Sequence, residues 1–220
     1  DVNSQYDFLS DYVTRQFSAT GVSSPLVADK NYSDTDIIRA MAGQGGGTRR
    51  RVGEDGNVEV PSGITARAFA AEQARKALSA EDGWDYSEAS DAEMIDALLY
   101  NVWPHMSLWA GYAPNLIYRW RPNGLDPDSA IMDVMILKRV PKNGPRPAPV
   151  PVHFLSENER WSDAAELGGL AGVFEQDMGN LPYVQEGLRS SGIGVVHFAR
   201  YSEMRIRQLH KLLDRYMGMS

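Results

Sequence analysis

The sequence comprises 220 residues with a formal net charge of −7 and no cysteine. The missing thiols exclude disulfides, iron–sulfur ligation within these residues and a cysteine nucleophile. The acidic balance argues against nucleic acid or an anionic membrane as the main partner, and no apolar run is long enough to span a bilayer. With 43% hydrophobic residues the chain can bury a core, and we expect one cytoplasmic domain over residues 1–220.

The N-terminal half predicts strands followed by helices. Residues 5–22 alternate roughly between apolar and polar side chains, which is typical of one or two strands. Helices are expected over residues 36–42, over residues 65–79 with a threonine N-cap, and after a capping box at residues 90–93. The glycine-rich segment 43–57 lacks the Lys-Ser or Lys-Thr of a phosphate-binding loop, so we interpret it as a surface loop.

The middle of the chain is rich in aromatic residues and predicts an antiparallel meander. Its strands are expected over residues 100–109, with an interruption at Pro104, and over residues 115–121 and 131–140. Alternation along the second strand places three side chains on one face: Leu116, Tyr118 and Trp120.

One stretch, residues 167–181, is the strongest candidate site. At 3.6 residues per turn its apolar side chains share one helix face: Leu167, Leu170, Ala171, Phe174, Met178 and Leu181. Asp177 lies on that same face, where a carboxylate is costly unless it is paired, protonated or bound to a cation. Gly168, Gly169 and Gly172 would let another backbone approach closely. The alternative is that Asp177 pairs with a buried arginine or lies at a frayed helix end near Gly179.

Two more helices are expected after this stretch. Pro182 suits the first turn of a helix over residues 183–189. The last helix should run from Ser202, as N-cap, to about Met217, and Gly218 should end it.

Histidine is the other residue type that could hold a metal, and the chain has four: His105, His153, His197 and His210. None shows the His-x-x-x-His spacing of a helical metal site. A metal site built within the chain from His153, His197 and Asp177 remains an alternative.

Several segments resemble the catalytic domain of Rieske-type aromatic-ring-hydroxylating oxygenase α subunits. They are residues 100–109 with the hairpin that follows, residues 174–177 followed by 185–188, and the opening segment 1–25. The first contains an aromatic-Pro segment in which His105 stands where the family usually has asparagine.

The resemblance implies an α+β helix-grip (START-like) fold, in which a curved antiparallel sheet packs on helices and the C-terminal helix is long. It implies a mononuclear Fe(II) held by two histidines and one carboxylate, with open positions for dioxygen. Asp177 matches that carboxylate and is therefore the expected catalytic and metal-binding residue. Four residues match positions that line the apolar substrate pocket: Leu99, Trp109, Tyr112 and Phe174.

The family's iron-binding histidine motif and its Rieske ligands do not occur in these 220 residues. We therefore expect the C-terminal part of a longer α subunit, with the [2Fe-2S] Rieske cluster in an upstream domain and no cofactor bound to these residues alone. The parent would hydroxylate an aromatic or polycyclic apolar substrate with O2, in aromatic hydrocarbon catabolism. Ferredoxin and reductase would supply electrons to a trimer of α subunits, with or without a small β subunit. The alternative is a non-catalytic helix-grip protein that binds a hydrophobic ligand.

Overall fold

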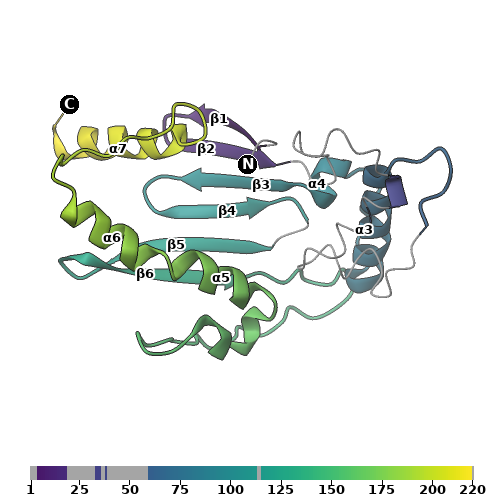
Figure 1. The fold of residues 1–220 in the computed structure, drawn as a ribbon. Coiled ribbons are helices and arrows are strands. Elements are labelled where there is room, and N and C mark those ends of the chain that lie inside the picture. The colour runs from purple at the N-terminus through teal and green to yellow at the C-terminus, as the bar shows by residue number, and fades with distance from the viewer. Residues whose placement is uncertain (1–3, 19–32, 36–37, 39–58, 113–114, 220) are drawn as a thin grey trace.

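The computed structural model describes residues 4–18, 33–35, 38, 59–112 and 115–219. Six antiparallel strands of this part form one sheet in which each strand pairs with its neighbours in sequence (Figure 1). The strands are β1 (Ser4–Ser10), β2 (Val13–Ser18), β3 (Ala97–Val102), β4 (Met106–Ala110), β5 (Leu116–Asn123) and β6 (Asp126–Ile136). The sheet and the helices on it confirm the predicted α+β class with an antiparallel sheet and a long C-terminal helix.

The strand predictions are confirmed with small shifts of their ends. Strands β1 and β2 form a hairpin within the predicted segment 5–22, and β3 and β4 flank Pro104, whose peptide bond with Trp103 is cis. The predicted strand 131–140 begins earlier, at Asp126, and ends at Ile136, because pairing with β5 extends the ladder into the expected turn. The predicted helix 36–42 and the loop 43–57 lie almost entirely outside the described residues.

The helices fall into two groups (Figure 1). They are α3 (Ala66–Asp82) and α4 (Asp91–Ile95) at one end of the sheet, and α5 (Leu170–Met178), α6 (Leu181–Ser190) and α7 (Met204–Met217) across one face. Two short 3-10 helices, η2 (Trp161–Asp163) and η3 (Ala165–Leu167), precede α5. Among the described residues, no helix has both the length and the apolarity that a bilayer span requires.

The helix ends follow the predicted capping chemistry at three of four positions. The Thr65 hydroxyl accepts a hydrogen bond from the Ala68 N–H at 3.2 Å, and Ser90 with Glu93 forms the reciprocal capping box. Gly218 adopts a φ of +69° and ends α7. The predicted N-cap at Ser202 is wrong, since α7 begins at Met204.

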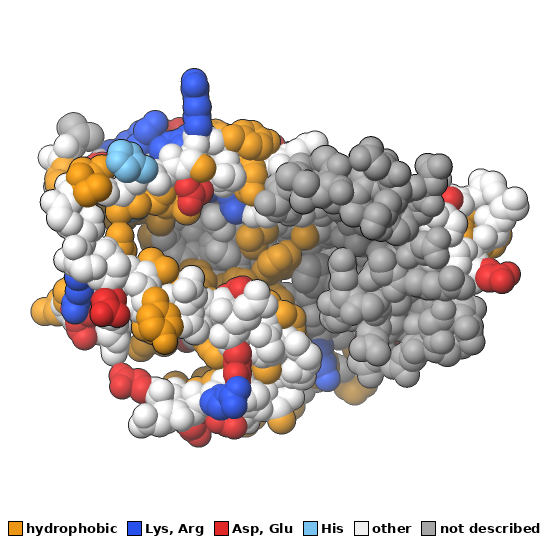
Figure 2. Space-filling model, viewed as in Figure 1, with side chains coloured by type: hydrophobic (Ala, Val, Ile, Leu, Met, Phe, Trp, Pro, Cys, Tyr) orange, Lys and Arg blue, Asp and Glu red, His pale blue; other side chains and the backbone are white. Residues whose placement is uncertain are grey.

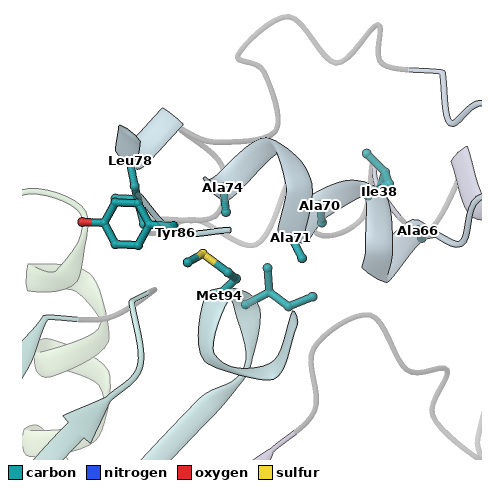
Figure 3. Packing of buried hydrophobic residues seen from close by; sticks show 9 residues of the cluster. Ile38, Ala66, Ala70, Ala71, Ala74, Leu78, Tyr86 and Met94 are labelled. Atoms are coloured by element: carbon teal, nitrogen blue, oxygen red, sulfur yellow. The ribbon is translucent and has the colours of Figure 1, made fainter. Parts of the chain in front are cut away.

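Small side chains let α3 approach α4, and their contact forms the buried core (Figure 3). Ala70, Ala71 and Ala74 of α3 face Met94 of α4, and all four are at most 1% exposed. Since alanine has no side chain beyond Cβ, the two backbones come close enough to leave Met94 without solvent contact. This core lies at the end of the sheet, away from α5 and α7.

One ion pair is sealed beside this core. Both carboxylate oxygens of Asp96 accept hydrogen bonds from Arg67, at 2.7 and 2.8 Å, and Asp96 is 1% exposed. The Asp96 carboxylate holds the pKa of Arg67 above its usual value. A buried charge that keeps both of its hydrogen-bonded contacts is tolerated, whereas loss of its partner is strongly destabilising.

We predict that Arg67→Met lowers the free energy of unfolding by on the order of 3 kcal/mol, because it removes the bidentate partner of a buried carboxylate. Urea unfolding at pH 7 measures the change. The control is Arg121→Met, which removes one of two arginines from the partly exposed Asp133 and should cost much less. Equal losses in the two variants would contradict the prediction.

Candidate functional site

The candidate stretch 167–181 is not the single helix that its pattern predicted. It is divided into η3, α5 and the start of α6. Gly168 separates the first two with a φ of +52°, a left-handed conformation that glycine adopts without strain. Apart from its chain neighbours and its own helix, a Cβ atom added at Gly168, Gly169 or Gly172 would have no atom of the described residues within 4 Å. The expected close approach of another backbone at these glycines is therefore wrong.

The register of the sheet places two predicted pocket residues on the face below α5. Leu99 and Trp109 are direct partners across β3 and β4, so their side chains share a face. Ser107, two residues before Trp109, pairs with Tyr118, which therefore points to the same side. Tyr118 contacts Phe174 of α5 edge-to-face with ring centroids 5.8 Å apart. Leu99, Trp109, Tyr118 and Phe174 thus line the same side of the sheet.

Phe174 is the centre of the contact between α5 and the sheet. It is 3% exposed, with Tyr118 on one side and Trp161 of η2 stacked on it at 4.9 Å on the other. Ala171, one turn earlier, is also buried. Burial of such aromatic rings contributes both apolar area and specific ring geometry. These contacts fix α5 over β5.

The surface is hollowed next to this contact. Figure 2 shows a recess between α7 and the α5–α6 pair, with hydrophobic side chains gathered around it. The sheet lies behind these helices in the same view (Figure 1). We refer to the space between this sheet face and helices α5 to α7 as the chamber.

Asp177 is exposed to solvent and lies at the edge of the helix face that meets the sheet. The expectation of an enclosed carboxylate is wrong, and the helical geometry gives the reason. Ala171, Phe174 and Met178 cluster within about 60° around the helix axis, whereas Asp177 is displaced a further 60° to one side of them. The side chain is close enough to Tyr118 for its charge to help raise the pKa of that phenol. Asp177 therefore borders the sheet face and is accessible from solvent.

Burial is the main cause of the raised pKa of Tyr118, and the Asp177 charge adds to it. The buried indole N–H of Trp109 is directed at the phenol and offsets part of the rise. Tyr118 is thus a neutral phenol at pH 7, next to the Asp177 carboxylate and the Trp109 indole N–H.

Glu175, beside this face, has a structural role. Its carboxylate accepts hydrogen bonds from Arg160 and from the N–H and hydroxyl of Ser162, at 3.0 and 2.8 Å. The Arg160 guanidinium is the largest cause of the lowered pKa of Glu175, about 2. The carboxylate fastens η2 to α5 and so keeps Trp161 on Phe174.

Within the described part of the chain, no three side chains of His, Cys, Asp or Glu are grouped so that they could hold a metal ion. His153 instead contacts Glu166 at 2.9 Å, and His210 packs against Phe198. The alternative site from His153, His197 and Asp177 is therefore wrong. Asp177 offers a single carboxylate, which by itself does not fit a mononuclear iron centre.

The remaining predicted pocket residue, Tyr112, lies elsewhere. It packs against the α3–α4 core, with its ring 5.0 Å from that of Tyr86 and the Arg139 guanidinium 5.6 Å above it. The structure thus groups Leu99, Trp109 and Phe174 and separates Tyr112 from them. Sequence reasoning did not single out Trp161 or Arg205, which also face this region, because neither lies in a motif.

Comparison with known families gives one match. The family model described as "ring hydroxylating alpha subunit (catalytic domain)" matches residues 29–219 of the chain. No curated protein matches the chain, and no solved structure matches it.

We predict that the stabilising effect of Glu175 depends on pH. Its pKa falls from an ordinary value near 4.5 to about 2 on folding, so its contribution is present above pH 4.5 and is lost as the pH falls toward 2. Wild type should be more stable than Glu175→Gln at pH 6, and the difference should shrink steadily between pH 4.5 and 2.

Thermal unfolding of both proteins across this pH range measures the effect. Glu186→Gln is the control, because its exposed carboxylate on α6 makes no hydrogen bond or ion pair among the described residues. A stability difference for Glu175→Gln that stays constant from pH 6 to pH 2 would refute the prediction.

Proposed function

The chain belongs to the ring-hydroxylating α-subunit family, in its catalytic domain, and from this premise we propose that it hydroxylates an apolar aromatic substrate with O2 in the chamber. Leu99, Trp109 and Phe174 would line the pocket for the ring, and Asp177 would be the carboxylate ligand of a catalytic iron. Tyr112 would reach the substrate only from the α3–α4 end.

The observation that carries this proposal is the position of Asp177. Its carboxylate lies one turn after Phe174, beside Tyr118, and is accessible from solvent. An apolar aromatic surface with one free carboxylate at its edge suits a substrate ring that must lie next to a metal ion.

The iron would need two further ligands. The described residues contain no group of three metal-ligating side chains, and we propose that two imidazoles from outside these 220 residues complete the site with Asp177. Fe(II) in a two-histidine, one-carboxylate site keeps positions at which dioxygen can be activated. Electrons would come from a Rieske [2Fe-2S] cluster outside these residues, reduced by ferredoxin and reductase, in a trimer of α subunits.

The chain's own residues would bind and orient the ring. Trp109 and Phe174 offer ring faces and edges for aromatic contact. The stack of Trp161 on Phe174 would cover one side of the chamber. The neutral Tyr118 would keep a hydroxyl group near the Asp177 carboxylate. These features would exclude water from the ring and hold it beside Asp177.

A second candidate is a non-catalytic protein that binds a hydrophobic ligand. It is favoured by the lack of any three-ligand group among the described residues. It predicts that ligand binding is independent of Asp177 and of iron.

We predict that Asp177→Asn in the intact protein removes mononuclear iron and lowers product formation by at least about 100-fold. Mutation of a residue that only supports a metal ligand already costs about 10- to 100-fold in metal affinity or activity, and loss of the ligand itself should cost more. The Rieske cluster should remain reducible. Iron content, visible absorbance and product formation are measured on the same samples.

Two controls come from the same helix. Gln176→Ala changes an exposed neighbour, and Met178→Ala removes the next side chain along the chain; both should keep the iron. If Asp177→Asn retains its iron and turns over normally, Asp177 is not the ligand and the binding-protein candidate gains support.

A further inference from the structure

Helix α6 is the least anchored of the three helices around the chamber. All ten of its residues are described, and none of them is buried. By contrast, α5 buries Ala171 and Phe174, and α7 buries Leu212. Helices in globular proteins are stabilised mainly by the packing of an apolar face. An element with few buried apolar contacts changes position at low cost, so α6 is the helix of this group that can move most easily.

One carboxylate on the sheet holds α6 in its place. Asp128 of β6 accepts a hydrogen bond from Gln185 Nε2 at 2.8 Å and forms an ion pair with Arg189. Among the described residues, these two contacts are the only side-chain hydrogen bond and ion pair that join α6 to another element. We call them the latch. Its side chains are exposed, and exposed pairs contribute little to stability because they compete with water and salt.

One face of α6 is apolar and yet open to solvent. Three side chains of this face are 46–50% exposed and lie within about 60° around the helix axis: Leu181, Val184 and Leu188. Such a stripe normally faces a core. It lies about 90° around the axis from Gln185 and Arg189, which reach the sheet at Asp128. The stripe therefore flanks the sheet-facing side of α6, next to the recess around which hydrophobic side chains gather (Figure 2).

A second apolar stripe on α7 faces α6 across the recess. Its three side chains are 38–40% exposed and lie within about 60° around the axis: Ile206, Leu209 and Leu213. Two contacts fix the orientation of α7. Arg215 reaches Asp11 in the β1–β2 turn, whereas Tyr216 packs on Trp103 in the β3–β4 turn. The stripe lies on the Tyr216 side of the helix, which is the side toward β5, β6 and α6.

The chain on both sides of α6 permits a movement of this helix. Gly179 lies between α5 and α6. After α6, residues 191–197 are all exposed, and the chain is next held at Phe198, which packs on His210 of α7. Gly194 in this segment has a φ of +63°, a conformation that glycine adopts without strain. Hinges consist of a few such residues at the end of an element, which absorb the change in dihedral angles.

We propose that α6 is a lid of the chamber and that the structure shows the lid open. In the open state the latch on Asp128 holds α6 beside the end of the β5–β6 hairpin (Figure 1). When the latch opens, α6 rotates about Gly179 toward α7, and the two apolar stripes close over the recess. The burial of apolar surface drives this closure.

This inference rests on the proposed function, because it assigns the chamber to an apolar substrate. A bound ring system offers further apolar surface to the stripe of α6, so the ligand favours the closed state through its differential contacts. Closure also covers Asp177, which precedes the hinge and is exposed in the open state. Lids of this kind exclude water from a reaction site.

Distances between spin labels on paired cysteines in the intact protein test the movement, since these 220 residues contain no cysteine of their own. One pair joins α6 to α7 through Ser190→Cys and Lys211→Cys, at exposed positions outside the stripes and the latch. A rotation of about 20° moves the far end of a ten-residue helix, about 15 Å long, by about 5 Å. Addition of biphenyl, a neutral apolar ligand, should therefore shift the population toward distances shorter by roughly 5 Å.

The latch variant Asp128→Ala should produce the same shift without ligand, because it removes both contacts that hold α6 back. Addition of Leu188→Gln to this variant should restore the longer distance, since a polar side chain in the stripe opposes its burial. The matched control is a label pair on Gln176→Cys of α5 and Lys211→Cys of α7. Its distance should stay constant in all samples, because Phe174 fixes α5 on the sheet.

An unchanged distance between α6 and α7 in Asp128→Ala would overturn the inference, whatever the effect of biphenyl. An equal change between α5 and α7 would also overturn it, because the lid would then not move independently of α5. Persistence of the shift after Leu188→Gln would exclude closure by the stripes. The Asp128→Ala comparison requires neither iron nor turnover, so it decides the lid separately from the proposed function, which the iron content of Asp177→Asn decides.

Discussion

The contact between Phe174 and the sheet is the interaction on which the candidate site depends. Phe174 is enclosed by Tyr118 from below and Trp161 from above, and its position sets where α5 crosses β5. Aromatic contacts of this kind add about 0.5–1.5 kcal/mol each beyond area burial. Without them α5 has one other buried residue, Ala171, and Asp177 would have no fixed relation to the sheet.

The two faces of the sheet carry different kinds of side chain. The face below α5 and α7 carries Leu99, Trp109 and Tyr118, whereas the opposite face carries ion pairs such as Asp133 with Arg119 and Arg121. The two arginines hold the pKa of Asp133 well below its usual range. Strand alternation separates the two sets, because neighbouring residues point to opposite sides.

The chamber contains polar groups whose hydrogen-bonding or charge interactions are incomplete. Within the described residues, Arg205 has buried donors that meet no acceptor, and Asp177 is an exposed carboxylate at the opposite end. Elsewhere the same molecule completes such interactions, as in the Arg67–Asp96 pair and the clamp on Glu175. Incomplete interactions that gather on one sheet face are typical of a binding site, where stability is lower until the ligand is present.

Sequence pattern alone was sufficient to predict the strands, the helix caps at Thr65 and Ser90, and the α+β class. These features depend on local chemistry, which the sequence contains. The resemblance carried by residues 100–109 and 174–177 indicated the family that the match over residues 29–219 then showed. The tertiary structure decided the rest. It divided the stretch 167–181 at Gly168, placed Asp177 at the edge of the buried face, and separated Tyr112 from Trp109 and Phe174. It also brought Arg205 to Gln16, 189 residues away in sequence, a contact that depends on how α7 packs on the sheet and that no local pattern contains.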